Sequence, residues 1–467
     1  TVNTQIHFMN YWLEKRNNKD ILLKTTLRNM EGKTIYISEK NIYEIGAHVI
    51  HLKDFISTLS QDKKCNEGSI ELEFLSKHNL VMPYPAIVVR YVGESWHTCA
   101  HSTQRYFSID SGDTNLRINE SSIAEEGNIT IHNNEDYEPF FIIHNGKNEL
   151  SKAELMVTIT SKSGKEINSI PMNLNWKSFQ TRVFNLSDLI DFRSFLGNQI
   201  GTFKVKFLIS GVFSRIIAGQ RLKNDGQWSI DHTNFAASDG AVLKDVFQTS
   251  SDPSFKNLVF NVPNSSNSSW ECYADIYPTY PENRYTVKVN SSNSNSKEVE
   301  STTLLLEKGS KNAMQRINCC STTNNEIIFN HQNFLPRRFH IGVQYKINNG
   351  HYGFLTDGPL PHDSYGNSTR WMPLFDTSSC ENFFLIANRA MGDQKSKKNS
   401  FTVNLFNSFG DSPLVSSFDI LENESKTHNV CELFKDYDSY LKGESGWIYL
   451  TSKSPQHCVL HYVSVKS

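Results

Sequence analysis

Three histidines recur at matching places along the chain and could together bind a metal ion. His101, His232 and His362 lie at nearly equal intervals, and each follows the last strand-like segment of a repeated pattern. A hydroxyl residue and an aromatic residue stand close behind each of them. Neutral imidazole is a ligand for zinc, iron and copper, and a set of three leaves a coordination position for water or substrate. The spacing therefore predicts a mononuclear transition-metal site, with zinc or iron as the metal.

Charged residues near these histidines are the candidate catalytic groups. Arg105 and Arg370 could hold an anionic group of a small-molecule substrate through bidentate hydrogen bonds. Asp231 could orient a neighbouring imidazole as a hydrogen-bond acceptor. In the alternative, the arginines are solvated or ion-paired, the aspartate caps a turn, and the histidines are scattered polar residues of loops. The chain has 16 histidines, so spacing alone does not decide between the two interpretations.

His97 and Cys99 stand just before the first of the three histidines and suggest two other kinds of chemistry. His97 and His101 form an HxxxH pair, but the glutamate that serves helical zinc proteases as general base is absent from it. We therefore expect His97 to hydrogen-bond to the backbone. Cys99 could act as a nucleophile only with a base and an oxyanion hole. No motif for such a hole is visible, and a buried, inert thiol is the favoured interpretation of Cys99.

Aromatic segments provide the main alternative to a metal enzyme. Trp270 to Tyr273, Tyr277 to Tyr280 and Tyr365 to Trp371 are rich in tyrosine and tryptophan. Such side chains could stack on sugar rings or contact a partner protein, or they could pack between parts of the fold. No nucleotide-binding glycine motif and no GxSxG motif occurs in the chain. The alternative function is thus a non-catalytic carbohydrate- or protein-binding scaffold.

The elements that must position these residues are predicted to be β-strands. Apolar and polar residues alternate in several segments, which is typical of antiparallel strands with one buried face. Glycine-, asparagine- and serine-rich turns separate them, as in β-sandwiches. Helical patterns are few and short, at 185–192 and 240–247. The clearest strand patterns are at 70–74, 155–160, 203–207 and 401–406.

An internal repeat divides the chain. The same succession of segments occurs in three places. A strand rich in phenylalanine comes first, a short apolar segment with one acidic residue follows later, and a glycine then begins another strand. The acids are Asp54, Asp188 and Glu432, and the glycines Gly68, Gly201 and Gly446 follow them by 13 or 14 residues. A fourth, diverged copy fits at 256–350. We therefore predict tandem β-sandwich-like units at 1–118, 119–252, 253–378 and 379–467, the first three with long loop tails that carry the three histidines.

Composition limits the class of protein and of partner. The chain has 467 residues, long enough for several cores, and a net charge of −2, which argues against an extended nucleic-acid interface. No apolar run is long enough to span a membrane, and a homo-oligomer is compatible with the sequence. Eight cysteines without a CxxC pair favour free thiols. No leader is recognisable, so a cytoplasmic protein and one secreted after removal of a leader both stay open.

Overall fold

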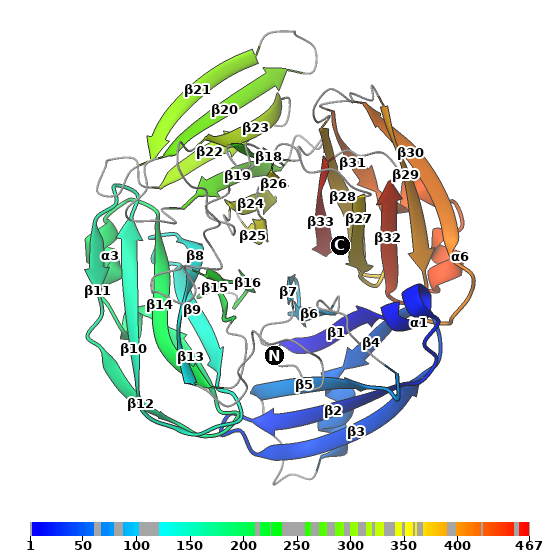
Figure 1. Ribbon diagram of the computed structural model, residues 1–467, viewed down its shortest axis with the longest axis horizontal. Coiled ribbons are helices and arrows are strands. Elements are labelled where there is room, and N and C mark those ends of the chain that lie inside the picture. Colours follow the sequence, from blue (N-terminus) through cyan, green and yellow to red (C-terminus); the bar gives the residue numbers. More distant parts are fainter. Residues whose placement is uncertain are drawn as a thin grey trace.

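The chain folds into antiparallel β-sheets with a few short helices, which confirms the all-β fold class (Figure 1). The structure is a computed structural model. It describes residues 2–59, 67–78, 87–101, 121–210, 215–224, 226–235, 257–262, 270–277, 285–293, 299–306, 314–319, 323–330, 341–347, 351–357, 360–361, 368–389, 398–421, 424–452 and 457–466.

Sheet pair 1 (residues 3–101) contains a sheet of order β4-β1-β6-β7 and a sheet of order β3-β2-β5. A core that includes Phe8, Trp12 and Leu23 lies between them. Alternation of apolar and polar residues gives each strand one face for this core. The elements are β1 (Asn3–Met9), α1 (Tyr11–Arg16), β2 (Ile21–Asn29), β3 (Thr34–Ile42), β4 (Ala47–His51), α2 (Leu52–Thr58), β5 (Gly68–Leu75), β6 (Ile87–Val92) and β7 (His97–His101).

Sheet pair 2 (residues 121–235) contains the sheets β13-β9-β15-β16 and β11-β10-β14-β8-β17, with β12 also paired to β10. Its core includes Phe141, Val157 and Phe203, which are almost fully buried. The elements are β8 (Ser121–Ile131), β9 (Tyr137–His144), β10 (Leu150–Ser161), β11 (Glu166–Asn168), β12 (Met172–Trp176), β13 (Thr181–Asn185), η3 (Leu186–Asp188), α3 (Phe192–Leu196), β14 (Gly201–Ser210), β15 (Ile217–Leu222), β16 (Trp228–His232) and β17 (Asn234–Phe235).

Sheet pair 3 (residues 257–361) contains the sheets β22-β19-β24-β25 and β21-β20-β23-β18-β26. The elements are β18 (Asn257–Val262), β19 (Glu271–Ile276), β20 (Tyr285–Asn293), β21 (Val299–Leu306), β22 (Gln315–Cys319), β23 (Thr323–Asn330), β24 (Ile341–Ile347), β25 (His351–Asp357) and β26 (Leu360–Pro361).

Sheet pair 4 (residues 368–466) contains the sheets β31-β28-β33 and β27-β32-β29-β30 around a core that includes Phe384, Phe401 and Leu450. The elements are β27 (Ser368–Leu374), β28 (Cys380–Arg389), β29 (Lys398–Phe406), β30 (Leu414–Leu421), β31 (Ser425–Asn429), α5 (Val430–Leu433), α6 (Tyr437–Leu441), β32 (Gly446–Ser452) and β33 (His457–Lys466). Strand pairing thus places 368–374 in a sheet with 446–452, whereas the sequence-based division assigned 368–374 to the third unit.

A similar strand order recurs in the four sheet pairs, although among the described residues β3-β2-β5 and β31-β28-β33 each lack an edge strand that their counterparts have. In one sheet of each pair, the matching positions are occupied, in chain order, by β1, β9, β19 and β28. In the other sheet they are occupied by β5, β14, β23 and β32. Gly68, Gly201 and Gly446 each begin one of these latter strands. A Cβ on Gly68 would lie 2.0 Å from the carbonyl oxygen of Arg28 on the neighbouring strand, so the close approach of the backbones requires glycine there. The acidic residues of the repeat, Asp54, Asp188 and Glu432, lie in the helical turns α2, η3 and α5.

The four sheet pairs follow one another around a ring (Figure 1). β16 lies against both β7 and β25, and β18 lies against β28 and β33, so each pair contacts the next along the chain. The ring closes where sheet pair 4 meets sheet pair 1. There the indole of Trp447 donates a hydrogen bond to the Tyr11 hydroxyl at 2.7 Å, and the amide of Ala47 donates to the carbonyl of Asn407 at 2.9 Å.

Two local expectations differ from the structure. The segments with His101 and His232, predicted as loop tails, are the strands β7 and β16. These two strands pair with β6 and β15 and extend each sheet by one strand. Their short sequences, which are rich in polar residues, did not indicate this. The segment 185–192, predicted to be helical, contains the 3-10 turn η3, and its last residue, Phe192, begins α3. The pattern at 240–247 lies outside the described residues.

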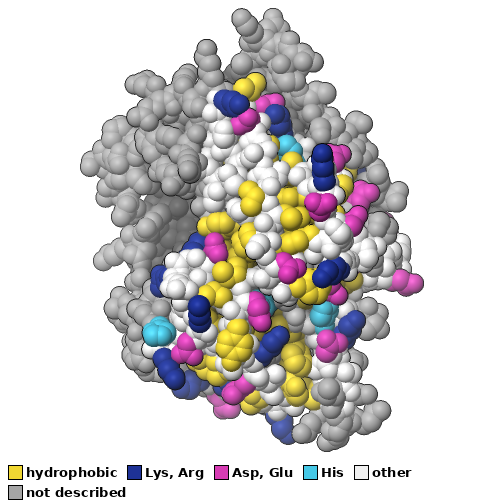
Figure 2. Space-filling view, turned by 90° about the vertical axis from the view of Figure 1, so that its right-hand side faces the viewer, with side chains coloured by type: hydrophobic (Ala, Val, Ile, Leu, Met, Phe, Trp, Pro, Cys, Tyr) yellow, Lys and Arg dark blue, Asp and Glu magenta, His cyan; other side chains and the backbone are white. Residues whose placement is uncertain are grey.

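No helix among the described residues has the length and apolarity to cross a membrane. Over the face in Figure 2, basic and acidic side chains are interspersed and apolar side chains lie between them. This described surface therefore shows no gathering of basic side chains of the kind that a nucleic acid would require.

Candidate functional site

Two of the three predicted histidine ligands lie side by side. His101 ends β7 and His232 ends β16, and their ring centroids are 6.1 Å apart with the ring planes nearly perpendicular. The ring of Trp371, from β27, lies 5.6 Å from that of His101. The third predicted ligand, His362, lies outside the described residues, as does Arg105. The described residues contain no group of three or more His, Cys, Asp or Glu side chains that could hold a metal ion.

The contacts of His232 do not favour metal coordination. Its Nδ1 lies 3.1 Å from the carbonyl oxygen of Thr233, so this nitrogen carries the proton and donates it. The other nitrogen, Nε2, faces the guanidinium of Arg215 at 3.4 Å. Burial, together with the positive charge of Arg215, lowers the pKa of His232 to about 3. A metal at Nε2 would have to displace Arg215 first.

The two other candidate catalytic residues that the structure describes have different surroundings. Asp231 is buried, and its Oδ1 accepts a hydrogen bond from the backbone amide of His232 at 2.7 Å. Arg370 is half-buried in β27, on the strand that pairs with β32. The structure therefore brings two of the predicted site residues, His101 and His232, together through the contact between β7 and β16.

The surroundings of Cys99 favour the protonated thiol. It lies on β7, and burial, together with the nearby carboxylate of Asp231, raises its pKa to about 12. The thiolate is the reactive form, so a thiol with this pKa is a poor nucleophile at neutral pH.

A thiol-labelling experiment tests this assignment. With an aromatic disulfide reagent at pH 7.5, we expect the exposed Cys431 to react in the native protein and Cys99 to react only after denaturation, because the reagent needs a thiolate that it can reach. Peptide mass spectrometry identifies the labelled cysteine. Labelling of Cys99 in the native protein at a rate similar to that of Cys431 would contradict the assignment.

The aromatic segments contribute mostly to packing. Trp270 is buried and its ring lies edge-on to Phe383 at 5.2 Å, where sheet pair 3 meets sheet pair 4. Tyr277 is almost fully buried. Trp371 is stacked on Trp447 at 5.4 Å. None of these three described side chains is presented as an open platform for a sugar ring; Tyr280 and Tyr365 lie outside the described residues.

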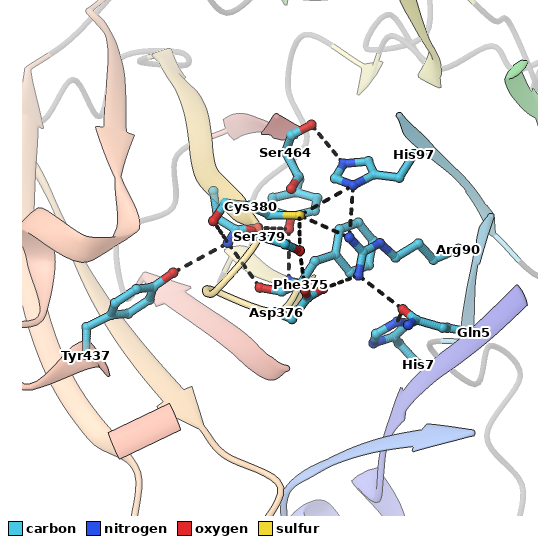
Figure 3. Close-up of polar contacts among 12 residues, drawn as sticks. Gln5, His7, Arg90, His97, Phe375, Asp376, Ser379, Cys380, Tyr437 and Ser464 are labelled. Carbon is cyan, nitrogen blue, oxygen red and sulfur yellow. Dashed lines mark hydrogen bonds and ion pairs between the residues drawn. The ribbon is translucent and has the colours of Figure 1, made fainter. Parts of the chain in front are cut away.

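A buried cluster of polar side chains surrounds Arg90, which sequence reasoning missed. Arg90 is on β6, only 1% exposed, and joins sheet pair 1 to sheet pair 4 (Figure 3). Its guanidinium forms an ion pair with Asp376 and donates to Gln5 Oε1 at 3.1 Å. The cation also lies over the ring of Phe375, 4.3 Å from the centroid. We call Arg90, Gln5, His97, Asp376, Ser379 and Cys380 the closure cluster.

His97 and Cys380 complete the closure cluster. The second guanidinium nitrogen of Arg90 lies 2.9 Å from His97 Nδ1 and 3.0 Å from the sulfur of Cys380. Since Arg90 can only donate, Nδ1 of His97 accepts, and Nε2 donates to the backbone carbonyl of Ser464 at 3.0 Å. This confirms the expected backbone hydrogen bond of His97. Both nitrogens of this neutral imidazole are therefore engaged, Nδ1 with Arg90 within sheet pair 1 and Nε2 with Ser464 of sheet pair 4.

Asp376 balances the charge of Arg90. Its side chain is 30% exposed, and it also accepts a hydrogen bond from Ser379. Burial opposes ionisation of Asp376, but the hydrogen bonds from Ser379 and Arg90 outweigh it and lower the pKa of this carboxyl. One cation and one anion thus neutralise each other inside the contact, which reduces the cost of burying both.

His7 lies beside this cluster, and we expect it to make the contact sensitive to acid. The ring is 1% exposed and packs edge-on to Phe375 at 5.0 Å. Burial and the positive charge of Arg90 lower the pKa of His7 from 6.5 to about 3. Between these two values the unfolded chain binds a proton that the folded chain does not. The contribution of His7 to stability is therefore complete well above pH 6.5 and falls as the pH falls through 6.5 toward 3.

Unfolding in urea at two pH values measures this effect. We expect the wild type to lose stability from pH 6.5 to pH 5, and His7→Phe to lose about 1.5 kcal/mol less over the same interval, since each pKa unit corresponds to about 1.4 kcal/mol and half of the unfolded chains already carry this proton at pH 6.5. The difference between the two pH values is the readout, so any change in stability at pH 6.5 cancels. An equal loss in the variant and the wild type would show that His7 is not the group responsible.

A second buried polar group joins sheet pair 2 to sheet pair 3. Asp275 on β19 is fully buried and forms a bidentate ion pair with Arg316 on β22, with both nitrogen–oxygen distances 2.7 Å. The hydroxyl of Thr130, on β8, donates to the same carboxylate at 2.6 Å. The side-chain oxygen of Gln344 accepts hydrogen bonds from Arg316 at 3.0 Å and from His132 Nε2 at 3.1 Å. Every one of these contacts lies within or between sheet pairs 2 and 3.

Comparison with known proteins adds no assignment: no protein-family model matches the chain, and no curated protein matches its sequence.

Proposed function

We propose that the chain is a non-catalytic scaffold protein, built from four β-sandwich units in a closed ring, that binds protein partners. The observation that supports this proposal is the closure cluster. Its charged and polar groups lie between the first and last sheet pairs and bond to one another. Groups used in this way hold parts of a fold together, whereas catalytic groups are directed toward a substrate. The recurring strand order supports the division into four units.

A metal-binding protein that acts on a small anionic or sugar-like substrate is the second candidate. The contact between His101 and His232 favours it, because two imidazoles 6.1 Å apart could turn toward a shared ion. The position of Arg215 at Nε2 of His232 favours the scaffold instead, because a metal would have to replace this cation. The second candidate also requires a third ligand, and the sequence predicts His362 for this role.

Elemental analysis of the purified full chain distinguishes the two candidates. The protein is incubated with zinc or with ferrous iron, passed through a desalting column and measured by mass spectrometry of the elements. The scaffold proposal predicts much less than one metal ion per chain, with the same content in His232→Ala. One equivalent of zinc or iron that is lost in His232→Ala would overturn the scaffold proposal in favour of the metal site.

A further inference from the structure

The strand β5 lies at the edge of its sheet, whereas its counterparts in the other sheet pairs do not. The order β3-β2-β5 ends at β5. In the other three sheet pairs β14, β23 and β32 each have a further antiparallel neighbour, which is β8, β18 and β27 respectively. Among the residues that the structure describes, β5 is paired on one side only, so the backbone groups on its other side face no described strand and are candidates to accept one.

The burial of β5 shows the same difference. Counted from the glycine that begins each strand, the second, fourth and sixth following residues face the core. In β14 these residues, Phe203, Val205 and Phe207, are at most 1% exposed. In β5 the residues Ile70, Leu72 and Phe74 pack against the core but are only partly buried, and Leu75 is 45% exposed. The core of sheet pair 1 is therefore less covered along this edge.

The charges along β5 indicate what kind of strand fits. The alternate residues Glu71 and Glu73 form ion pairs with Arg28 at 2.5 Å and with Lys24 at 2.8 Å, both from β2. The same positions of β14 are Lys204 and Lys206. The neighbouring strand β8 places Glu125 opposite Lys206 and 3.2 Å from Lys204. The strand that flanks β14 thus presents a negative charge to its two lysines.

A second copy of β5 would fit this edge poorly. Two β5 strands in antiparallel pairing would place glutamates of both copies opposite one another, and like charges across a strand pair are unfavourable. A strand with lysine or arginine at the outward positions would instead face Glu71 and Glu73 with opposite charge, as Glu125 faces the lysines of β14. Apolar residues between the basic ones would cover Ile70, Leu72 and Phe74.

We propose that the open edge of β5 binds an extended segment of a partner protein, in which apolar residues alternate with lysine or arginine, as an added antiparallel strand. Main-chain hydrogen bonds supply affinity in this mode, and the alternating side chains supply specificity. The inference rests on the proposed function in one respect, that the chain binds protein partners.

A peptide-binding experiment tests the proposal with the full chain. The probe is a fluorescent peptide with the sequence of residues 201–208, Gly-Thr-Phe-Lys-Val-Lys-Phe-Leu, in which lysine alternates with apolar residues. The control peptide has glutamate in place of both lysines. Fluorescence anisotropy is expected to show at least tenfold tighter binding of the lysine peptide. The double variant Glu71→Gln/Glu73→Gln should reduce this preference to less than threefold, and Glu39→Gln, on the far strand β3 of the same sheet, should leave it unchanged.

Hydrogen exchange of the wild type gives a second readout that does not depend on the folding of a variant. Amides of residues 68–75 should exchange more slowly with the lysine peptide present, and those of the interior strand β14 should not change. Binding of neither peptide, or binding without slower exchange at 68–75, would overturn the proposal. Such a failure leaves the metal content and the closure cluster unaffected, so it is distinguishable from a failure of the scaffold proposal.

Discussion

Replacement of Arg90 by methionine is expected to lower the free energy of unfolding by about 2–4 kcal/mol, because removal of one partner leaves buried polar groups without their bonds. Asp376 would lose its cation, and Gln5 and His97 would lose a hydrogen-bond donor. Methionine keeps much of the apolar stem that packs on Phe375. Urea unfolding followed by tryptophan fluorescence measures the loss.

An exposed ion pair between two sheet pairs provides the matched control. Lys177 and Glu31 join sheet pair 2 to sheet pair 1 at 2.5 Å, but both side chains are more than half exposed. Solvent screens such a pair, so Lys177→Met should leave the unfolding midpoint unchanged within experimental error. If Arg90→Met behaves like Lys177→Met, the contacts of the closure cluster are not stabilising and the account of the ring contact is wrong.

Replacement of Arg316 by methionine is expected to have an equal or larger effect, a loss of about 3–5 kcal/mol, because its partner carboxylate is completely buried. Asp275 is 0% exposed, and Arg316 provides two of its hydrogen bonds. The hydroxyl of Thr130 remains as a donor, but it carries no charge. The loss is measured by urea unfolding at pH 7.

A second substitution separates the buried charge from the lost packing of Arg316. In Arg316→Met/Asp275→Asn the carboxylate is replaced by a neutral amide, so the double variant should be more stable than Arg316→Met alone. A double variant that is less stable than Arg316→Met would show that the unpaired carboxylate is not the cause of the loss.

The strands of this fold were predictable because alternation of apolar and polar residues is a local signal. The segments at 70–74, 155–160, 203–207 and 401–406 all lie in strands of the structure. The repeated glycines were visible for a physical reason as well, since Gly68 leaves no room for a side chain against the neighbouring backbone. β7 and β16 were missed because five-residue strands that contain His, Cys and Asp have no clear alternation.

The closure cluster was not predictable, because it depends on how the ring closes. Arg90 stands in the sequence as one polar residue inside the strand pattern Val88-Val-Arg-Tyr, and its partner Asp376 is 286 residues away. A polar residue in a strand normally faces solvent. Here β6 meets sheet pair 4 on the side where Arg90 lies, so the side chain is buried. Spacing drew attention to the histidines instead, and only the contact of β7 with β16 could show that two of them are neighbours.

The coupling energy between Arg90 and Asp376 tests most directly whether a buried polar contact closes the ring. Unfolding free energies of the wild type, Arg90→Met, Asp376→Asn and the double variant form a double-mutant cycle. The account predicts that the two side chains stabilise each other by more than about 1 kcal/mol, so that the double variant loses clearly less than the sum of the single losses. The account would be contradicted if the loss in the double variant equalled the sum of the two single losses to within about 0.5 kcal/mol, because distant and independent residues behave in that way.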